Sequence, residues 1–261
     1  MITLYDGGTH MPLLWSNLVP ATLEGRAIHN VQNAMFAAAM AHSMEVGLED
    51  IRHGLRTFDT TFFQAPGRMN IFDDHPFKVI LDYGHNPAAV GAMVDLVEQL
   101  DVRGRRICVL STPGDRRDED VRAIAEIAAG SFDHYVCRRD DVLRGREPNE
   151  IPELLRSALL AAGVANENID VIPDEVEATE AALQSAAPGD LLLVFGDNIA
   201  RTWNQIQSFA ADPAAQAHDT RACAAPPVTL PDLPDLALQN GPSLIRDERG
   251  VRIARDVEEA D

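Results

Sequence analysis

Three short segments of the sequence combine carboxylates with basic or amide side chains, and each follows directly on an apolar run. They are residues 82–87 (DYGHNP), 113–120 (PGDRRDED) and 138–147 (RRDDVLRGRE). Arginines bind carboxylate or phosphate groups, and carboxylates accept hydrogen bonds from hydroxyl groups. We therefore look for the chemistry of this chain in these three segments.

The segment 82–87 has the composition of a nucleotide-binding loop. A carboxylate (Asp82), an imidazole (His85) and an amide (Asn86) precede a helix that opens with Pro87. The free N–H groups at a helix start attract anions such as phosphate, and Asp82 could accept hydrogen bonds from a ribose hydroxyl. A capped helix beside a solvent-exposed histidine accounts for the same residues equally well.

The other two segments also have a structural interpretation. In 113–120 the adjacent arginines could hold carboxylate or phosphate, whereas Asp118 could simply cap the following helix. In 138–147 the dense mixture of both signs suits a zwitterionic or guanidinium-bearing ligand, and surface ion pairs are the alternative. The residues alone leave these alternatives open.

Two further groups precede these segments. Residues 29–33 (HNVQN) open an alanine-rich helix, for which Asn30 is the expected N-cap, and Arg68 in PGRM has no evident packing role. The sequence contains no GxxxxGK[ST] phosphate loop, GxGxxG fingerprint, GxSxG elbow or HExxH pair. We predict no metal site in this chain.

The elements that position these residues follow a regular alternation from residue 77 onward. Five apolar strands, each followed by a helical segment, predict an α/β fold with a Rossmann-like, mainly parallel sheet covered on both faces. Right-handed crossovers place the loops after the strands along one edge, where ligands of such sheets bind. The expected strands are FKVILDYG, RICVLST, HYVCRR, IDVIPD and LLLVFGD.

The composition excludes several classes of function. The formal net charge of −19 argues against a protein that binds nucleic acid or an anionic membrane surface. The three cysteines form neither a disulfide framework nor a metal-binding spacing, and no apolar stretch approaches the ~20 residues of a membrane span. Because no signal peptide is visible, we expect a cytoplasmic protein.

The motifs, taken together and in order, resemble the Mur ligase family over roughly residues 1–209. IHNVQN, APGRMN and DYGHNP appear in the order typical of that family, and GDRRDED and DDVLRGRE resemble its cyanophycin synthetase branch. The family joins an amine to a carboxylate through an acyl phosphate made from ATP, which sits between a central and a C-terminal domain. In the cyanophycin synthetase branch the resemblance implies addition of arginine to the β-carboxylate of an aspartate backbone.

The resemblance also implies domain boundaries. Residues 1–65 are expected to be a partial, helical end of the central ATP-binding domain, and residues 66–211 the C-terminal domain. Residues 212–261 are acidic and proline-rich, which favours a flexible tail with a two-stranded piece around SLIRDERGVRIAR.

Matching positions carry the family's nucleotide-binding roles onto this chain. Asn33 is implied to contact adenine in a pocket that His29 and Asn30 shape. Arg68 and Asp82 are implied to hold the ribose and phosphate side of ATP.

The same matching implies the reacting groups. Asn86 is placed near the phosphates of ATP, beside His85. Together with His85, Asp115 and Arg116 of the GDR-type loop are the expected catalytic residues.

The loop 140–146 falls where related ligases select the incoming amino acid. Asp140 or Asp141 is expected to meet the guanidinium group of arginine, and Arg144 its carboxylate. The implied partners are therefore ATP with Mg²⁺, arginine and an acceptor of polyaspartate type.

The sequence departs from the family because it has no phosphate loop and no ATP-grasp half. We therefore expect that the isolated chain has no ligase activity and that most Mg²⁺ ligands lie outside it. The chain is then either a truncated reading frame or one half of a split enzyme, in which a partner chain carries the missing domains. The full enzyme is expected to be a homo-oligomer. The alternative is a non-catalytic remnant that binds a nucleotide or a partner; a ligase for peptidoglycan or folate is disfavoured by the two charged loops.

One further expectation concerns apolar surface. Met35, Phe36, Met40 and Met44 form a stripe at helical spacing. Such a stripe is usually core, but beside a partial domain it could instead be a docking surface.

Overall fold

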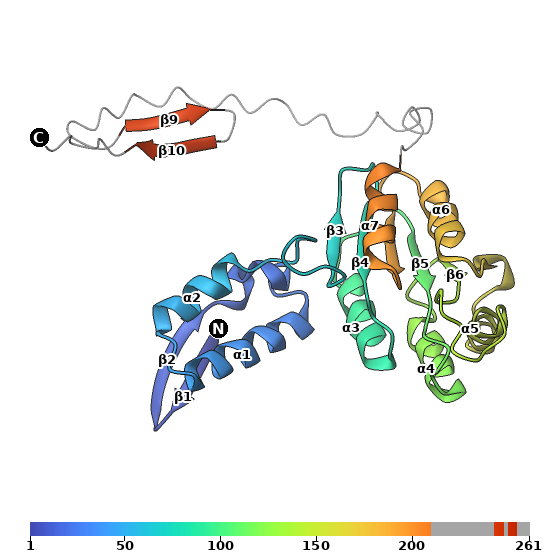
Figure 1. Cartoon of the computed structure of the whole chain (residues 1–261), viewed down its shortest axis with the longest axis horizontal. Coiled ribbons are helices and arrows are strands. Elements are labelled where there is room, and N and C mark those ends of the chain that lie inside the picture. Colours follow the sequence, from blue (N-terminus) through green and yellow to red (C-terminus); the bar gives the residue numbers. More distant parts are fainter. Residues whose placement is uncertain (210–242, 248–249, 255–261) are drawn as a thin grey trace, which may run out of the picture. The chain divides into compact units, whose positions relative to one another are not determined.

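The chain folds around a six-stranded sheet, seen in a computed structural model that describes residues 1–209, 243–247 and 250–254 (Figure 1). The strand order is β3-β4-β8-β5-β6-β7; β3 is antiparallel to β4 and all other neighbours are parallel. This confirms the predicted α/β class. The strands are β3 (Asn70–Phe72), β4 (Lys78–Asp82), β5 (Arg106–Leu110), β6 (His134–Cys137), β7 (Ile169–Val171) and β8 (Leu191–Phe195).

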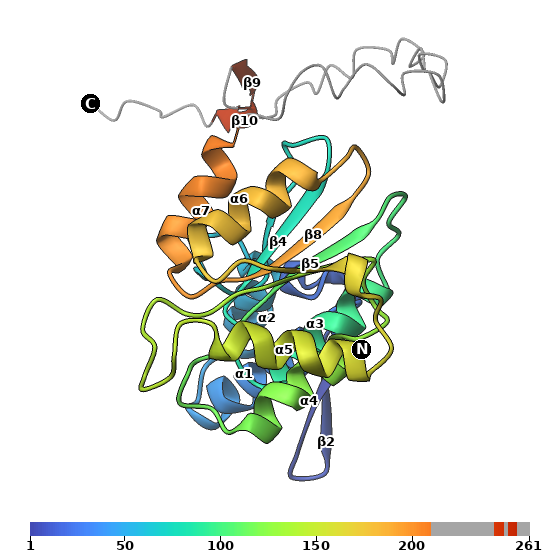
Figure 2. The same cartoon turned by 90° about the vertical axis from the view of Figure 1, so that its right-hand side faces the viewer.

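Helices cover both faces of the sheet (Figure 2). Along β4, Ile80 packs with the helices of one face, whereas Val79 and Leu81 pack on the other, as the two-residue period of a strand requires. Every residue of β8 is buried, which explains its unbroken apolar run. One face carries α3 (Pro87–Glu98), α4 (Asp118–Ala128) and α5 (Glu150–Ala161), and the other carries α6 (Glu175–Ser185) and α7 (Ile199–Ser208).

The position of β8 shapes the edge where the strands end. It is the last strand of the sheet in sequence, yet it lies between β4 and β5. After β4 and β5 the chain turns to one face, and after β8 it turns to the other. Loops that part in this way open a crevice at the carboxyl ends of the strands, which is where open α/β sheets bind ligands.

The N-terminal part has its own small core, formed where a hairpin meets two helices. The hairpin pairs β1 (Ile2–Asp6) with β2 (Thr9–Leu14) through Gly7 and Gly8, whose φ angles of +53° and +82° suit a tight two-residue turn. Two 3₁₀ turns and two helices follow. They are Ser16–Leu18, Pro20–Thr22, α1 (Ile28–Ser43) and α2 (Leu48–Thr57).

The start of α1 corrects one expectation. The helix begins at Ile28, with Ala27 at the capping position, so Asn30 lies inside the first turn and is not the N-cap. The amide of Asn30 instead donates to the carbonyl of Ala21 at 2.8 Å. Asn30, which the sequence assigns to the N-cap of this helix, therefore binds the preceding 3₁₀ turn instead.

A second unit near the C-terminus contains an antiparallel hairpin of β9 (Ser243–Asp247) and β10 (Gly250–Ala254). It matches the two-stranded piece expected around SLIRDERGVRIAR. The flexibility expected for the rest of the 212–261 tail falls on residues outside the described ones. Among the described residues, no helix has the length and apolar character needed to cross a membrane.

Candidate functional site

The loops that follow β4, β5, β6 and β8 enclose a small crevice at the carboxyl edge of the sheet. Two predicted site residues, His85 and Asp140, line it. Thr112 is 1% exposed, and its Oγ1 has no hydrogen-bond partner within the described part of the chain. The other lining residues are Tyr83, Gly84, Ser111, Pro113, Arg138, Phe195 and Gly196.

Asp82, the last residue of β4, is buried and ties this edge to the preceding turn. Its carboxylate accepts hydrogen bonds from the backbone N–H groups of Met69 (2.9 Å) and Gly84 (2.7 Å). Burial raises the pKa of Asp82, and these two hydrogen bonds together with the nearby Arg68 and His29 oppose the rise. The carboxylate thus organises the loop, and each oxygen keeps a second lone pair that can accept from a ligand.

The next residues of the loop form an aromatic and basic cluster. The guanidinium of Arg68 lies 5.8 Å from the centre of the Tyr83 ring, which packs edge-on against His85 at 5.0 Å. His85 Nδ1 lies 2.9 Å from the carbonyl oxygen of Tyr83, and since a carbonyl can only accept, Nδ1 carries the hydrogen. In the neutral ring, Nε2 is then a proton acceptor. Asn86 caps α3 by accepting from Ala89 N at 2.9 Å, as the structural interpretation of this segment predicts.

The predicted nucleotide-binding residues of α1 have two different surroundings. Burial lowers the pKa of His29, and the negative charge of Asp82 opposes that shift. Asn33 donates to Asn30 Oδ1 at 3.1 Å, and both amides line a hollow of about 240 Å³ between α1 and α2. The remaining lining is almost wholly apolar: Val19, Ala21, Ala34, Ala37, Ala38, Ile51, Gly54, Leu55 and Phe58.

The two charged loops after β5 and β6 lie against each other. Asp115 and Arg144, predicted from different segments, form an exposed ion pair at 3.1 Å. A Cβ atom on Gly114 would lie 2.1 Å from the carbonyl oxygen of Leu143, so only glycine permits this contact. The structure thus brings predicted catalytic and substrate-binding residues together.

Arg146 holds this pair of loops in place. Its guanidinium donates to the carbonyl oxygens of Gly114 (3.0 Å) and Arg116 (2.7 Å), and it pairs with Asp118 (2.7 Å) and Glu150 (2.6 Å). These four contacts of one side chain fix the backbone position of Arg116. Asp118 therefore joins this cluster, in addition to lying in the first turn of α4.

The acidic residues expected to meet a substrate guanidinium already meet guanidinium groups of the chain itself. Asp140, 8% exposed, accepts from Ser111 Oγ at 2.6 Å and lies 3.6 Å from Arg138; burial raises its pKa. Asp141 pairs with Arg201 at 2.8 Å, and that hydrogen-bonded pair lowers the pKa of Asp141. The assignment of these acids to arginine stays a prediction.

A buried ion network that the sequence analysis missed lies directly behind these acids. Arg138 and Glu175, each 1% exposed, pair at 3.0 Å, and Glu175 also contacts Arg201. The carboxylate of Glu175 accepts from the backbone N–H groups of Asp197 (2.6 Å) and Asn198 (3.2 Å). Glu175 thereby fixes the β8–α7 loop.

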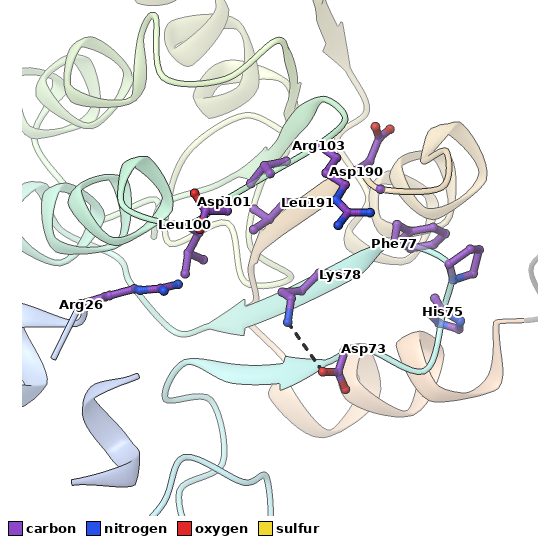
Figure 3. Close-up of a pocket in the computed structure, with 13 residues that line it drawn as sticks. Arg26, Asp73, His75, Phe77, Lys78, Leu100, Asp101, Arg103, Asp190 and Leu191 are labelled. Atoms are coloured by element: carbon purple, nitrogen blue, oxygen red, sulfur yellow. Dashed lines mark ion pairs between the residues drawn. The ribbon is translucent and has the colours of Figure 1, made fainter. Parts of the chain in front are cut away.

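A larger hollow of about 420 Å³ lies at the opposite edge of the sheet, where the strands begin (Figure 3). Arg26, Lys78 and Arg103 line it, and Lys78, the only lysine in the sequence, pairs with Asp73 at 3.6 Å. None of the predicted site residues lines this hollow, so we keep the carboxyl edge as the candidate site. In the described part of the chain, no group of three or more His, Cys, Asp or Glu side chains could hold a metal ion.

Comparison with known proteins adds a family and several relatives. The family model described as "Mur ligase, glutamate ligase domain" matches residues 67–198. Cyanophycin synthetase from Geminocystis herdmanii is 33% identical over 208 residues, which make up 80% of this chain and 24% of the relative. The enzyme of the same name from Crocosphaera subtropica is 37% identical over 183 residues, 70% of this chain and 21% of the relative. The chain therefore spans less than a quarter of the length of these curated relatives.

Solved structures give the same fold. E. coli FolC in complex with DHPP and ADP is 26% identical, with a TM-score of 0.52, over 67% of this chain and 38% of that one. Folylpolyglutamate synthase from Mycobacterium tuberculosis, complexed with ADP and AMPPCP, shares the fold with a TM-score of 0.54 at 20% identity, over 70% of this chain and 41% of that one.

Proposed function

Since this chain belongs to the Mur ligase family, we propose that it is the C-terminal part of an ATP-dependent amide ligase of cyanophycin synthetase type. In this role it adds arginine to the β-carboxylate of an aspartate backbone. The isolated chain is inactive, because the phosphate loop of such a ligase belongs to a region that the sequence does not contain. The observation that carries the proposal is a pair of contacts made by Met69, because they link the adenine side to the strand-end loops. Asn30 Nδ2 of α1 lies 4.0 Å from Met69 Sδ, and the backbone N–H of Met69 donates to the carboxylate of Asp82, at the end of β4, at 2.9 Å.

The residues present fit an adenine nucleotide. The hollow lined by Asn30 and Asn33 has apolar walls and an amide at its rim, which suits a flat ring with hydrogen-bonding edges. Arg68 is exposed and stacks on Tyr83, so its N–H donors can reach ribose or phosphate oxygens. When bound, ATP supplies the phosphoryl group that activates a carboxylate towards an amine, and Mg²⁺ on its phosphates takes most of its protein ligands from outside this chain.

The chain's own groups then act by orientation and charge. His85 Nε2, left as a proton acceptor by the Nδ1 contact, can take a proton from the incoming amine. Arg116, on a backbone fixed by Arg146, is available to stabilise negative charge near the reacting phosphate. The exposed ion pair between Arg144 and Asp115 contributes only about 0–1 kcal/mol, so it can open at little cost. Arg144 is then free to bind a substrate carboxylate.

Nucleotide binding by the isolated chain tests the adenine assignment. We expect weak ADP binding by NMR titration, and about 3- to 10-fold weaker binding for Asn33→Ala, as for the loss of one hydrogen bond. Asn149→Ala removes an exposed amide just before α5 and should leave ADP binding unchanged. Equal affinities of both variants would contradict the assignment.

Arginine incorporation tests the reaction. We expect no ATP-dependent incorporation by the isolated chain, and incorporation when a chain with the missing domains is added. Robust turnover by the isolated chain would contradict the proposed incompleteness.

A second function, a non-catalytic nucleotide- or partner-binding remnant, is favoured by one observation. Asp140, Asp141 and Arg144 are all engaged with groups of the chain itself. Calorimetry with arginine distinguishes the two functions in the reconstituted mixture. Binding that Asp141→Ala weakens supports the ligase, and absence of binding supports the remnant.

A further inference from the structure

Two surfaces of the described chain lie away from the carboxyl edge of the sheet. The stripe of Met35, Phe36, Met40 and Met44 is exposed, by 51% to 76%, but its apolar side chains offer no charge that would select one partner. The hollow where the strands begin is different, because charged groups from separate parts of the chain line it. Its chemistry therefore restricts the ligand that it can bind.

Three cationic side chains surround this hollow of about 420 Å³ (Figure 3). Arg26 precedes α1, Lys78 opens β4, and Arg103 lies in the loop before β5. The volume suits a small organic ligand, for which pockets of about 300–1,000 Å³ are typical. The apolar side chains of Leu100 and Leu191 also line the hollow and can contact a carbon skeleton.

The loops on the sheet side of the hollow are tied together around Asp190. The carboxylate of Asp190 accepts from the backbone N–H of Arg105 at 2.7 Å, and its carbonyl oxygen accepts from the backbone N–H of Lys78 at 2.9 Å. A Cβ atom on Gly104 would overlap Asp190 Oδ1, so this close approach requires glycine. Lys78 and Arg103 therefore project from a fixed backbone.

The acids near the hollow leave these two cations available to a ligand. Asp190 is buried and pairs with Arg105 at 2.8 Å, so its charge is already neutralised. The pair of Lys78 with Asp73, at 3.6 Å, is exposed, and such pairs contribute little to stability, so an anion can replace Asp73. Arg103 is exposed and forms no ion pair with any other residue that the structure describes.

Arg26 is anchored to the sheet although it belongs to the N-terminal part. The next residue, Ala27, is fully buried in the core between the sheet and helices α3 to α5. The N–H of Ala27 donates to the carbonyl oxygen of Thr22 at 2.9 Å, which closes the turn that carries Arg26. The ion pair of Arg26 with Glu24, at 3.4 Å, is exposed and can open at little cost. A ligand that binds both Arg26 and Arg103 therefore bridges the N-terminal part and the sheet.

We propose that this hollow is a binding site for a small organic anion with at least two phosphate or carboxylate groups. Arginine binds either group through two parallel hydrogen bonds, and lysine binds it as a point charge. Asp73 and Asp101 also line the hollow and the chain has a net charge of −19, so a single anionic group gains little there. Two anionic groups in one molecule reach two cations in one binding event, which raises the affinity. This inference goes beyond the proposed function, because the hollow lies at the edge of the sheet opposite the candidate site.

The chain contains its own reporter for this site, because Lys78 is its only lysine. Reductive methylation with carbon-13 formaldehyde labels Lys78 Nζ and the α-amino group and keeps their charge, and Lys78→Arg identifies the lysine signal by its loss. We expect the NMR signal of Lys78 to shift and to saturate as pyrophosphate or citrate is added. Sulfate, which has one anionic group, should bind about 10-fold more weakly or less. Tighter binding of pyrophosphate identifies a phosphate ligand, and tighter binding of citrate identifies a polycarboxylate.

Matched variants test the two arginines with the tighter of these probes. Arg103→Gln and Arg26→Gln should each weaken binding by about 10- to 100-fold, as for the loss of a hydrogen bond to a charged group. The control is Arg122→Gln, which removes the same charge from an exposed position of α4 and should bind like the unsubstituted chain. Circular dichroism confirms that each variant is folded.

Three results would overturn the proposal. The first is a Lys78 signal that does not saturate with either probe, and the second is sulfate binding as tight as that of both probes. The third is an Arg103→Gln or Arg26→Gln variant that binds as well as Arg122→Gln. Because the probes could also meet the carboxyl edge, Arg68→Gln is titrated as well; an unchanged Lys78 titration supports the hollow, and a weakened one counts against it.

Discussion

Substitution of Glu175 by Gln tests whether the buried ion network holds the candidate site together. The change keeps the shape of the side chain but removes the charge that faces Arg138 at 3.0 Å. Breaking a buried pair by neutralising one partner costs about 3–5 kcal/mol, because the other charge stays buried without compensation. Arg138 keeps carbonyl partners and Asp140 at 3.6 Å, so we expect the lower end, about 3 kcal/mol.

Chemical and thermal unfolding measure this cost. For a folded unit of about 200 residues, 1 kcal/mol shifts Tm by roughly 2–4 °C, so Glu175→Gln should lower Tm by about 6–12 °C. The control is Glu177→Gln, the same change at an exposed position of the same helix, with an expected loss of no more than about 1 kcal/mol.

A double-mutant cycle isolates the pair. Arg138→Met combined with Glu175→Gln should cost less than the two single changes added together, by about 1–3 kcal/mol, since the double variant no longer buries the charge of Arg138 without that of Glu175. Additive single effects, or a Glu175→Gln variant within about 1 kcal/mol of the unsubstituted chain, would refute the reasoning.

Three further predictions follow from single features. Gly114→Ala should lower the free energy of unfolding in urea by about 1–3 kcal/mol, since the added Cβ would clash with the carbonyl oxygen of Leu143. The control is Gly54→Ala in helix α2, where an added Cβ meets no other atom, and it should raise that free energy by up to about 1 kcal/mol. Burial lowers the pKa of His29 below 6.5, so the unfolded chain binds the proton more readily and the stability of the fold decreases as pH drops below 6.5. His29→Gln should flatten the dependence of Tm on pH in melts at pH 7.0, 6.0 and 5.5. An unchanged dependence would contradict this prediction. Burial raises the pKa of Cys137 to about 12 and that of Cys108 well above its usual value, so a thiol reagent at pH 8 should modify them only as the chain unfolds, and fast labelling of the native chain, followed by peptide mass spectrometry, would count against this.

The fold was predictable from the sequence to the extent that it depends on local patterns. Apolar runs such as that of β8, alternating with helical segments, fix the number of parallel strands and the edge at which the loops gather. The edge strand β3, with three residues, was not predicted because so short a run has no readable period. The place of β8 between β4 and β5 depends on which face each crossover helix covers, and no local pattern encodes that choice.

The candidate site was predictable where chemistry follows directly on a strand. Asp82 and His85 follow from that pattern, whereas Asp115 follows from the resemblance to the family's GDR-type loop, and the roles of all three stay predictions. Glu175 could not be found in the same way: it opens α6 in the run EVEATE, where three glutamates look alike, and only burial distinguishes the one that pairs with Arg138.

The buried network around Glu175 and the loop contacts of Arg146 have the same structural role at the carboxyl edge of the sheet. Glu175 fixes the loop after β8, and Arg146 fixes the loops after β5 and β6, so both act on backbone and do not need to touch a ligand. The groups left for a ligand, Arg68, Arg144 and Asp115, are exposed or held only by an exposed ion pair. A rigid frame that carries exchangeable charges is the arrangement expected where a reaction depends on positioning and charge neutralisation, since the frame sets the geometry while the surface pairs open at little cost.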